Sequence, residues 1–170
     1  MKKIIGSIIA SVFSACMLVA QPNLKIGHIN TQELLQSMPE TDSAQLKLEK
    51  MQKELQNQLE VMQVELNNKY QDYLSKRDSY SELVRQTKED ELQNIQQRIQ
   101  QFAQNADQDL QRKRSELYKP ILDKANKAIE EVARENGFTY ILDLSSGVVL
   151  FHSESSLDIL PMVKAKLKLK

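Results

Sequence analysis

Few side chains in this sequence of 170 residues are of the types that carry out acid–base, nucleophilic or metal chemistry. The sequence holds two histidines, His28 and His152, and one cysteine, Cys16. Neither histidine belongs to a metal-binding spacing such as His-Glu-x-x-His, and each falls inside or at the end of an expected strand. We therefore interpret both histidines as structural side chains. The sequence predicts a protein that is not an enzyme and that uses no metal or other cofactor.

The remaining candidates for chemistry are equally isolated. Gly27 and Gly147 stand alone in strand and turn contexts, whereas a phosphate-binding loop needs several glycines at fixed spacing. The acidic run at residues 89–91 lies in a polar helical stretch, and we interpret it as a solvated surface. No small-molecule substrate is therefore expected.

The N-terminus has the pattern of a secretory signal peptide. Lys2 and Lys3 give it a basic start, an apolar core follows, and Leu18-Val19-Ala20 provides a cleavage site. We predict that residues 1–20 are removed near Ala20 and that the mature chain is exported. Two alternatives stay open: a membrane anchor, although the apolar run is shorter than the ~20 residues that span a bilayer, and a lipoprotein processed at Cys16.

The mature chain would contain no cysteine, so neither a disulfide nor a thiolate metal site is expected. The full sequence has 23 basic and 23 acidic residues, and the signal peptide contains two of the basic ones. The mature chain therefore carries 21 basic against 23 acidic residues, a net charge of −2. This balance argues against nucleic acid as a partner, because nucleic-acid binding usually requires a strongly basic face.

The longest uniform feature is the stretch 40–119, which has neither proline nor glycine and lies between Pro39 and Pro120. Gln, Glu, Lys and Leu dominate it, and its apolar residues recur at spacings of three and four, as one buried stripe on a helix requires. We predict a mostly α-helical protein with a small β part. The stripe comprises Ala44, Leu48, Met51, Leu55, Leu59, Met62, Leu66, Tyr70 and Tyr73, then Leu92, Ile95, Ile99, Phe102, Ala106, Leu110, Leu117 and Ile121.

The two halves of this stripe can face each other if the chain reverses near the middle. A reversal near residues 80–81 pairs Leu66 with Ile95 and Leu59 with Phe102, which predicts a long antiparallel helical hairpin. The polar, Ser-containing composition of residues 75–81 suits a turn, which we place within 76–84. A register shifted by one helical turn, or one uninterrupted helix of 80 residues, remains an alternative.

The two ends of the chain differ from this stretch in composition. We expect a strand over Leu24–Asn30 and then a short helix, capped by Asn30 and Glu33, that ends at Met38-Pro39. After Pro120 an amphipathic helix follows and stops at Asn136-Gly137, with glycine at its C-terminal cap.

The C-terminal end is expected to form a hairpin and a last helix. Strands over residues 138–144 and 148–152 would flank a turn at 145–147, and the helix would start at Pro161 and run to about Leu169. Three short strands leave open edges, and the last two are nearly all apolar, so we expect this base to assemble with other copies of the chain. The candidate assembly residues are Ile26, Ile29, Tyr140, Leu142, Val149 and Phe151.

At this point the sequence resembles the Skp/OmpH family of periplasmic chaperones. The resemblance rests on residues 25–30, on Glu33-Leu34-Leu35 and on Met38-Pro39-Glu40. It continues after the helical stretch with Pro120-Ile121 and with the segment 128–143, which includes Asn136-Gly137-Phe138. At the two ends of the chain the resemblance rests on specific motifs. In the helical stretch between them it rests only on amino-acid composition.

The resemblance implies a periplasmic homotrimer in which strands of three chains form a small barrel, with three helical hairpins around a cavity. Residues 21–39 and 120–170 would form the oligomerisation head, and residues 40–119 the hairpin arm. Members of the family hold unfolded outer-membrane proteins in that cavity without ATP. The best-known members are markedly basic, which this chain is not, so the resemblance is not extended to a lipid-binding site.

Candidate contacts to such clients are apolar side chains that the hairpin does not need for its own packing. An alternative interpretation is that the two valines among them widen the hairpin seam and that the tyrosines pack across it. The basic residues near the expected turn could meet a membrane surface, or could form a solvated face with the acidic residues among them. The candidates for client contact are Val61, Val64, Tyr73, Tyr80, Leu83 and Val84.

A second functional class uses the same helical stripes. A coiled-coil structural or adaptor protein of the cell envelope would also project long helices from an oligomeric base. The two classes differ in what the arms bind: several unrelated unfolded barrel proteins for a chaperone, and one folded partner for an adaptor.

Overall fold

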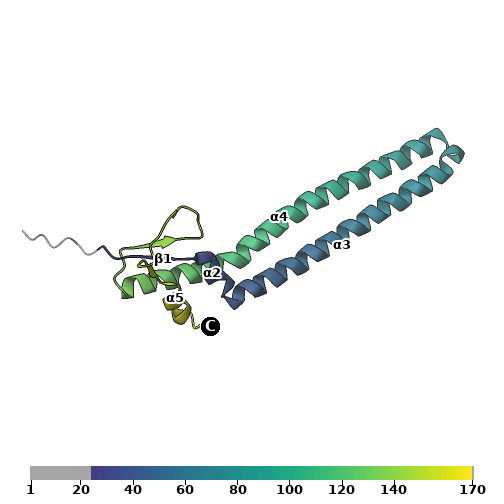
Figure 1. Cartoon of the computed structure of the whole chain (residues 1–170). Coiled ribbons are helices and arrows are strands. Elements are labelled where there is room, and N and C mark those ends of the chain that lie inside the picture. Colours follow the sequence, from purple (N-terminus) through teal and green to yellow (C-terminus); the bar gives the residue numbers. More distant parts are fainter. Residues whose placement is uncertain (1–23, 170) are drawn as a thin grey trace, which may run out of the picture.

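The computed structural model describes residues 24–169 (Figure 1). The predicted signal peptide, its cleavage at Ala20 and the alternative processing at Cys16 lie outside the described residues. Within residues 24–169, no helix has both the length and the apolar character that crossing a bilayer requires.

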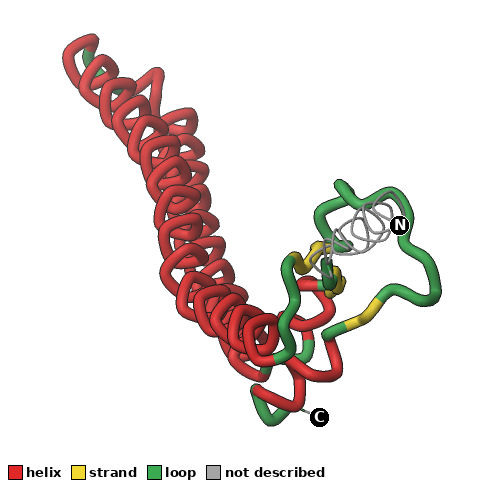
Figure 2. The backbone as a smooth tube through the Cα atoms, turned by 90° about the vertical axis from the view of Figure 1, so that its left-hand side faces the viewer, coloured by secondary structure: helices red, strands yellow, loops and turns green. Residues whose placement is uncertain are grey.

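Two long antiparallel helices project from a small mixed base (Figures 1 and 2). We call residues 39–119 the arm and the other described residues the base. The predicted fold class is confirmed in its main parts: long helices packed together and a small sheet. In chain order the elements are β1 (Ile26–Ile29), α2 (Thr31–Gln36), α3 (Pro39–Lys76), the 3-10 turn η1 (Arg77–Ser79), α4 (Glu82–Glu135), β2 (Tyr140–Asp143), β3 (Leu157–Asp158) and α5 (Leu160–Lys166).

The turn of the arm falls inside the range predicted for it. The chain leaves α3 at Lys76 and enters α4 after Ser81, whose side chain accepts a hydrogen bond from the Val84 backbone N–H at 3.5 Å and caps the helix. Across the seam, Lys69 binds Glu91 and Tyr73 binds Glu89. These contacts agree to within one residue with the register predicted near the turn.

The three strands form a parallel sheet in the order β2-β1-β3. Ile26 pairs with Tyr140 and Ile29 with Asp143, while His28 pairs with Asp158 on the other side of β1. Since β1 and β2 are parallel, the chain must cross from the end of one to the start of the other, and the whole arm lies within that crossover.

One face of the sheet is covered by helices and carries the main core. In α4, apolar side chains at spacings of four and three, from Ile121 to Val132, pack toward the sheet and α5. Leu34 and Val163 have no exposed surface, and Ile29 has 1%. The buried cluster consists of Ile29, Leu34, Met38, Ala44, Ile121, Ala125, Ala128, Val132, Ile159, Leu160 and Val163.

Helix α4 ends as the sequence predicted, at a glycine cap. Gly137 has φ of +68°, and its N–H bonds to the Arg134 carbonyl at 3.2 Å. The Phe138 N–H bonds to the Ala133 carbonyl at 2.9 Å, which completes the two-bond pattern of this cap. Helix α5 ends at Lys166 rather than near Leu169, because Lys168, with φ of +56°, closes a cap of the same kind.

Pro120 lies inside a continuous helix. Although the stretch without proline ends there, α4 runs from Glu82 to Glu135 through Pro120. Proline cannot donate the hydrogen bond to the carbonyl four residues earlier, so the helix lacks one backbone bond at the point where the arm joins the base. The predicted domain boundary at residue 120 therefore falls within one unbroken helix, and it stays a prediction.

The predicted hairpin of residues 138–144 and 148–152 is wrong. β2 covers only Tyr140–Asp143 and pairs in parallel with β1, and residues 148–152 form no strand in the described chain. A different segment, Leu157–Asp158, supplies the third strand. Two apolar runs around a glycine turn suggest a local hairpin, but here both β2 and β3 pair with the distant β1, a partner that local sequence patterns do not identify.

Candidate functional site

The seam between α3 and α4 is only partly covered. Apart from Ala44, which belongs to the base cluster, three apolar side chains in the described arm are buried: Met62, Tyr73 and Ile95. Most of the predicted stripe, including Leu55 and Leu59, is half-exposed. Two helices can shield only the central line of their contact, so the flanks of the stripe face solvent along the arm.

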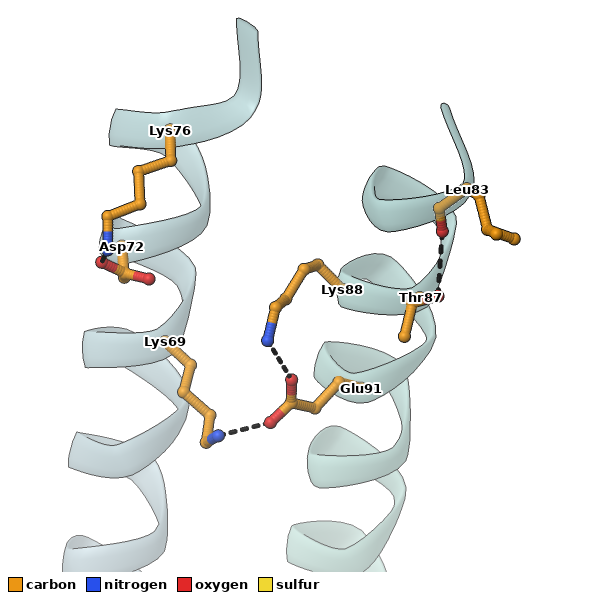
Figure 3. A network of polar contacts seen from close by, with 7 residues as sticks. All are labelled: Lys69, Asp72, Lys76, Leu83, Thr87, Lys88 and Glu91. Atoms are coloured by element: carbon orange, nitrogen blue, oxygen red, sulfur yellow. Dashed lines mark hydrogen bonds and ion pairs between the residues drawn. The ribbon is translucent and has the colours of Figure 1, made fainter. Parts of the chain in front are cut away.

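A polar cluster fixes the seam close to the turn (Figure 3). The Glu91 carboxylate accepts hydrogen bonds from Lys69 on α3 and, at 3.0 Å, from Lys88 on its own helix. These bonds, first that from Lys69 and then that from Lys88, hold the pKa of Glu91 below its ordinary value. The same carboxylate raises the pKa of Lys69. All three side chains are more than a third exposed, so water screens the cluster.

The basic residues near the turn mostly have acidic partners. Lys76 lies 2.5 Å from Asp72, Arg85 lies 2.6 Å from Glu82, and Lys88 binds Glu91. Such pairing supports the interpretation of this end of the arm as a solvated face of mixed charge.

Tyr73 joins the two helices from the middle of the seam. Its side chain is 6% exposed, and its hydroxyl donates a hydrogen bond to the Glu89 carboxylate on α4, which raises the pKa of Tyr73. The residue therefore packs across the seam, as the alternative interpretation proposed. In this conformation Tyr73 can offer a client only the small exposed part of its side chain that lines a neighbouring groove.

A groove of about 540 Å³ opens beside Tyr73 on one flank of the seam. Leu66, Leu92 and Tyr73 are its less exposed lining residues and form the floor, and Tyr70 is 47% exposed at its side. Exposed amide side chains from both helices complete the lining: Gln63, Asn67, Gln93 and Gln96. The sequence placed Tyr70 in the seam, so the groove was not predicted.

The other predicted client contacts are more accessible. Val61 is 60% exposed, Val64 52%, Leu83 76% and Val84 39%, and Tyr80 is half-buried at the turn. Three further apolar side chains are exposed on the arm and were not among the predicted contacts: Leu46, Tyr70 and Leu74. The helical period could have identified Leu74, because it lies four residues after Tyr70 on the same flank.

The base also exposes apolar side chains, on the face of the sheet that the helices leave uncovered. We call this the outer face; Ile26, His28, Tyr140 and Leu142 lie on it. Tyr140 is 59% exposed, and Ile26 and Leu142 are each 41% exposed. Of the candidate assembly residues, only Ile29 is buried within the core of its own chain.

The loop of residues 144–156 crosses the outer face and carries the most exposed apolar segment of the base. His28, 7% exposed, donates to or accepts from the Ser156 hydroxyl through Nδ1 at 2.8 Å, and its ring lies 4.6 Å from that of His152. Leu150 and Phe151 are 94% and 83% exposed, and Val149 is half-buried. In the described chain, no group of three or more His, Cys, Asp or Glu side chains could hold a metal.

The model of a known family matches almost the whole described chain. This family model, described as "Outer membrane protein (OmpH-like)", covers residues 25–167. The chain belongs to the OmpH-like family. The resemblance noted from the sequence is thus confirmed, at both ends of the chain and across the arm.

A solved structure supports the OmpH-like fold. The crystal structure of a candidate outer membrane chaperone (OmpH-like) from Caulobacter crescentus CB15 superposes with a TM-score of 0.72. The two sequences are 16% identical, and the match covers 86% of each chain, so the similarity is one of fold. No curated protein matches the sequence significantly.

Membership of the OmpH-like family bears on whether this chain is an enzyme. The family consists of periplasmic chaperones for outer membrane proteins and not of enzymes. The prediction that this chain is not an enzyme is therefore confirmed. The arm and the outer face of the base are the two surfaces with exposed apolar side chains, and they are the candidates for client binding and for assembly.

Proposed function

We propose that this protein is an ATP-independent periplasmic holdase that binds unfolded outer-membrane β-barrel proteins and prevents their aggregation in transit. Membership of the OmpH-like family carries this proposal. The chain would be exported by its signal peptide, cleaved near Ala20, and would act as residues 21–170.

The physical basis is the incomplete cover of the arm seam. An unfolded barrel strand exposes apolar residues at every second position, and in water these side chains associate with one another. Half-exposed side chains along α3 and α4, together with Val61, Val64 and Leu83, offer apolar surface over the length of the arm. Many weak contacts of this kind can shield a client without imposing one geometry on it.

The exposed apolar side chains of the outer face favour the proposal that the base assembles into a trimer. β2 and β3 each have one edge without a strand partner in the described chain, and Tyr140, Leu142 and Phe151 are exposed beside them. We propose that three chains bring these residues together and that the loop 148–152 packs between them. Three arms would then surround a common space.

Aggregation of a client tests the holdase proposal directly. A urea-unfolded outer-membrane β-barrel protein is diluted into buffer with and without residues 21–170, and light scattering is followed. We expect suppression near one oligomer per client without ATP, for several unrelated clients. Unchanged scattering with a folded oligomer would refute the proposal and favour an envelope adaptor with one folded partner.

The assembly proposal has its own test. We expect the mass of the mature protein, measured by light scattering after size-exclusion chromatography, to equal three chains. Phe151→Asp should lower that mass to one chain, because a charge would be buried in the interface. Leu83→Asp, at a similarly exposed apolar residue on the arm, is the matched control and should leave the mass unchanged. A wild-type monomer would contradict the trimer.

A further inference from the structure

We propose that the groove beside Tyr70 and Tyr73 is a binding slot for one aromatic side chain of an unfolded barrel protein. This inference rests on the proposed holdase function and assigns a specific ligand class to one place on the arm. The groove has a volume of about 540 Å³, within the ~300–1,000 Å³ range typical of small-ligand sites.

The floor of the slot is already positioned to receive a ring. Tyr73 is 6% exposed and its hydroxyl is bound to Glu89, so its orientation is fixed from α4. Tyr70, one helical turn earlier, is 47% exposed and lines the opening. Aromatic rings prefer offset or edge-to-face neighbours, and two tyrosines with Leu92 between the helices provide such neighbours for a third ring.

The charge and polarity of the slot match a neutral extended peptide. Among its lining residues, all of them described, only Glu89 carries a formal charge, and that carboxylate accepts a hydrogen bond from Tyr73. Gln63, Asn67 and Gln93 are exposed at the rim, and each amide offers both a donor and an acceptor to a peptide backbone. An acidic client segment would find no opposite charge in the slot, and the one carboxylate open to a basic segment is already bonded to Tyr73.

The spacing of exposed residues on the arm is compatible with a β-strand in the client. Leu74 is 46% exposed and lies four residues beyond Tyr70, about 6 Å further along the α3 axis. Alternate side chains of an extended strand are about 6.8 Å apart on one face. A strand with an aromatic residue in the slot would therefore place its next residue of that face on Leu74. Barrel strands carry such aromatic residues where they meet the membrane interfaces.

Peptide binding to the full mature oligomer tests the slot. The probe is a fluorescein-labelled nonapeptide of alternating valine and threonine with one central tryptophan, and the comparison peptide has leucine at that position. The chain itself has no tryptophan, so blue-shifted tryptophan emission of the unlabelled probe independently reports burial of the ring. We expect the tryptophan peptide to bind about five times more tightly than the leucine peptide, measured by fluorescence anisotropy.

Variants at the slot separate aromatic recognition from general apolar binding. Tyr70→Ala, which opens the slot, and Gln93→Phe, which fills it, should each reduce the preference for tryptophan to less than about twofold. Tyr70→Phe should keep the preference. Leu46→Ala removes another exposed apolar side chain of the arm, outside the slot, and is the matched control that should also keep the preference. Circular dichroism and the oligomer mass verify that each variant is folded.

The outcomes distinguish failure of the slot from failure of the holdase proposal. Equal binding of the two peptides, or an unchanged preference in folded Tyr70→Ala, overturns the slot even if the wild-type protein suppresses client aggregation. A tryptophan preference that Tyr70→Ala and Gln93→Phe abolish supports the slot, including in the case where aggregation of barrel clients is not suppressed and the holdase proposal fails alone.

Discussion

The base and the arm of this protein bury their apolar residues to very different extents. In the base, Ile29, Leu34 and Val163 have 1% exposed surface or none, and they belong to one cluster that draws on strands and helices. In the arm, two helices share a seam whose apolar side chains are mostly half-exposed. Stability is therefore concentrated in the base, whereas the arm keeps apolar surface available along its length.

This difference suits a chaperone of the OmpH-like family. A well-packed base tolerates little change in side-chain volume and can hold the chains of the proposed trimer in one arrangement. A half-covered seam gains less from packing, so its side chains can change neighbours at low cost. The following four predictions test this contrast, in order of decreasing expected effect.

Removing the outer part of the arm should separate assembly from client protection completely. Deletion of residues 63–99 joins Met62 to Gln100, which lie almost opposite each other in the hairpin. We expect the shortened protein to form an oligomer with the same number of chains as the wild type, as judged from its mass. Client protection in the scattering assay should be lost. A shortened protein that still protects clients would show that the arm is not the binding element.

Truncation of a core side chain in the base should be costly. Leu34→Ala removes a side chain with no exposed surface and should lower the free energy of unfolding by about 2–5 kcal/mol. Leu83→Ala, at a side chain that is 76% exposed on the arm, is the matched control and should change it by less than about 0.5 kcal/mol. Urea unfolding of both variants measures the contrast. Equal effects would show that the arm is as well packed as the base.

Asp143 links the end of β2 to the start of α2 and should make the base sensitive to acid. Burial raises the pKa of Asp143, but hydrogen bonds from Thr31 and Ser145 outweigh it and hold the pKa below its ordinary value of 3.8. A carboxyl whose pKa is lowered by folding stabilises the protein above its unfolded pKa, and this contribution is lost as the pH falls through the folded value.

Asp143→Asn should therefore lower the free energy of unfolding by about 1–3 kcal/mol at pH 7. The difference from wild type should shrink as the pH falls below about 4, where the carboxyl of the unfolded chain and then that of the folded chain become neutral. Urea unfolding of both proteins between pH 3 and pH 7 measures this difference in the free energy of unfolding. A difference that does not depend on pH would mean that shape, and not the charge of Asp143, matters at this site.

The polar cluster of Lys69, Lys88 and Glu91 near the turn should contribute least to the stability of the protein. The pKa of Glu91 is lowered by the hydrogen bonds from Lys69 and Lys88, so its contribution should be present above about pH 4.5 and should vanish as the pH falls through the folded value. Glu91→Gln should lower the thermal midpoint slightly at pH 7 and low salt. The exposed Glu60→Gln on the same arm is the control and should not change it.

The dependence on salt concentration provides a second test of the same cluster. Because the side chains of Lys69 and Glu91 are 41% and 36% exposed, added salt should screen their attraction. The difference between Glu91→Gln and wild type should therefore diminish at about 1 M salt. A large effect that persists at high salt would indicate that the tip of the arm is held as firmly as the base.

Periodicity was sufficient to predict the arm. Helix formers without proline or glycine, apolar spacings of three and four, and a Ser-containing turn identified α3, α4 and the reversal between them. The cap at Gly137 and the capping role of Asn30 also follow from local chemistry. These features depend on residues close in the sequence, and a helix uses the same local contacts wherever it lies.

The sheet could not be predicted in the same way. Residues 148–152 have the composition of a strand, yet they form a loop, and the short segment Leu157–Asp158 pairs with β1 instead. Pairing depends on a partner about 130 residues away, and the composition of a segment does not identify that partner. The groove was missed for a related reason, because the pattern of α3 alone does not show which side of Tyr70 faces α4.

The sequence by itself determined the long helical hairpin, its turn, the caps of its helices and the family, since these rest on local propensity and on motifs. Only the tertiary structure decided which strands pair, which apolar side chains stay exposed and why residue 27 is glycine. A Cβ atom at Gly27 would lie 2.8 Å from the Phe138 ring, so the close packing of that ring on β1 requires glycine there. Such requirements arise from atoms far apart in the chain, and only the folded arrangement brings them together.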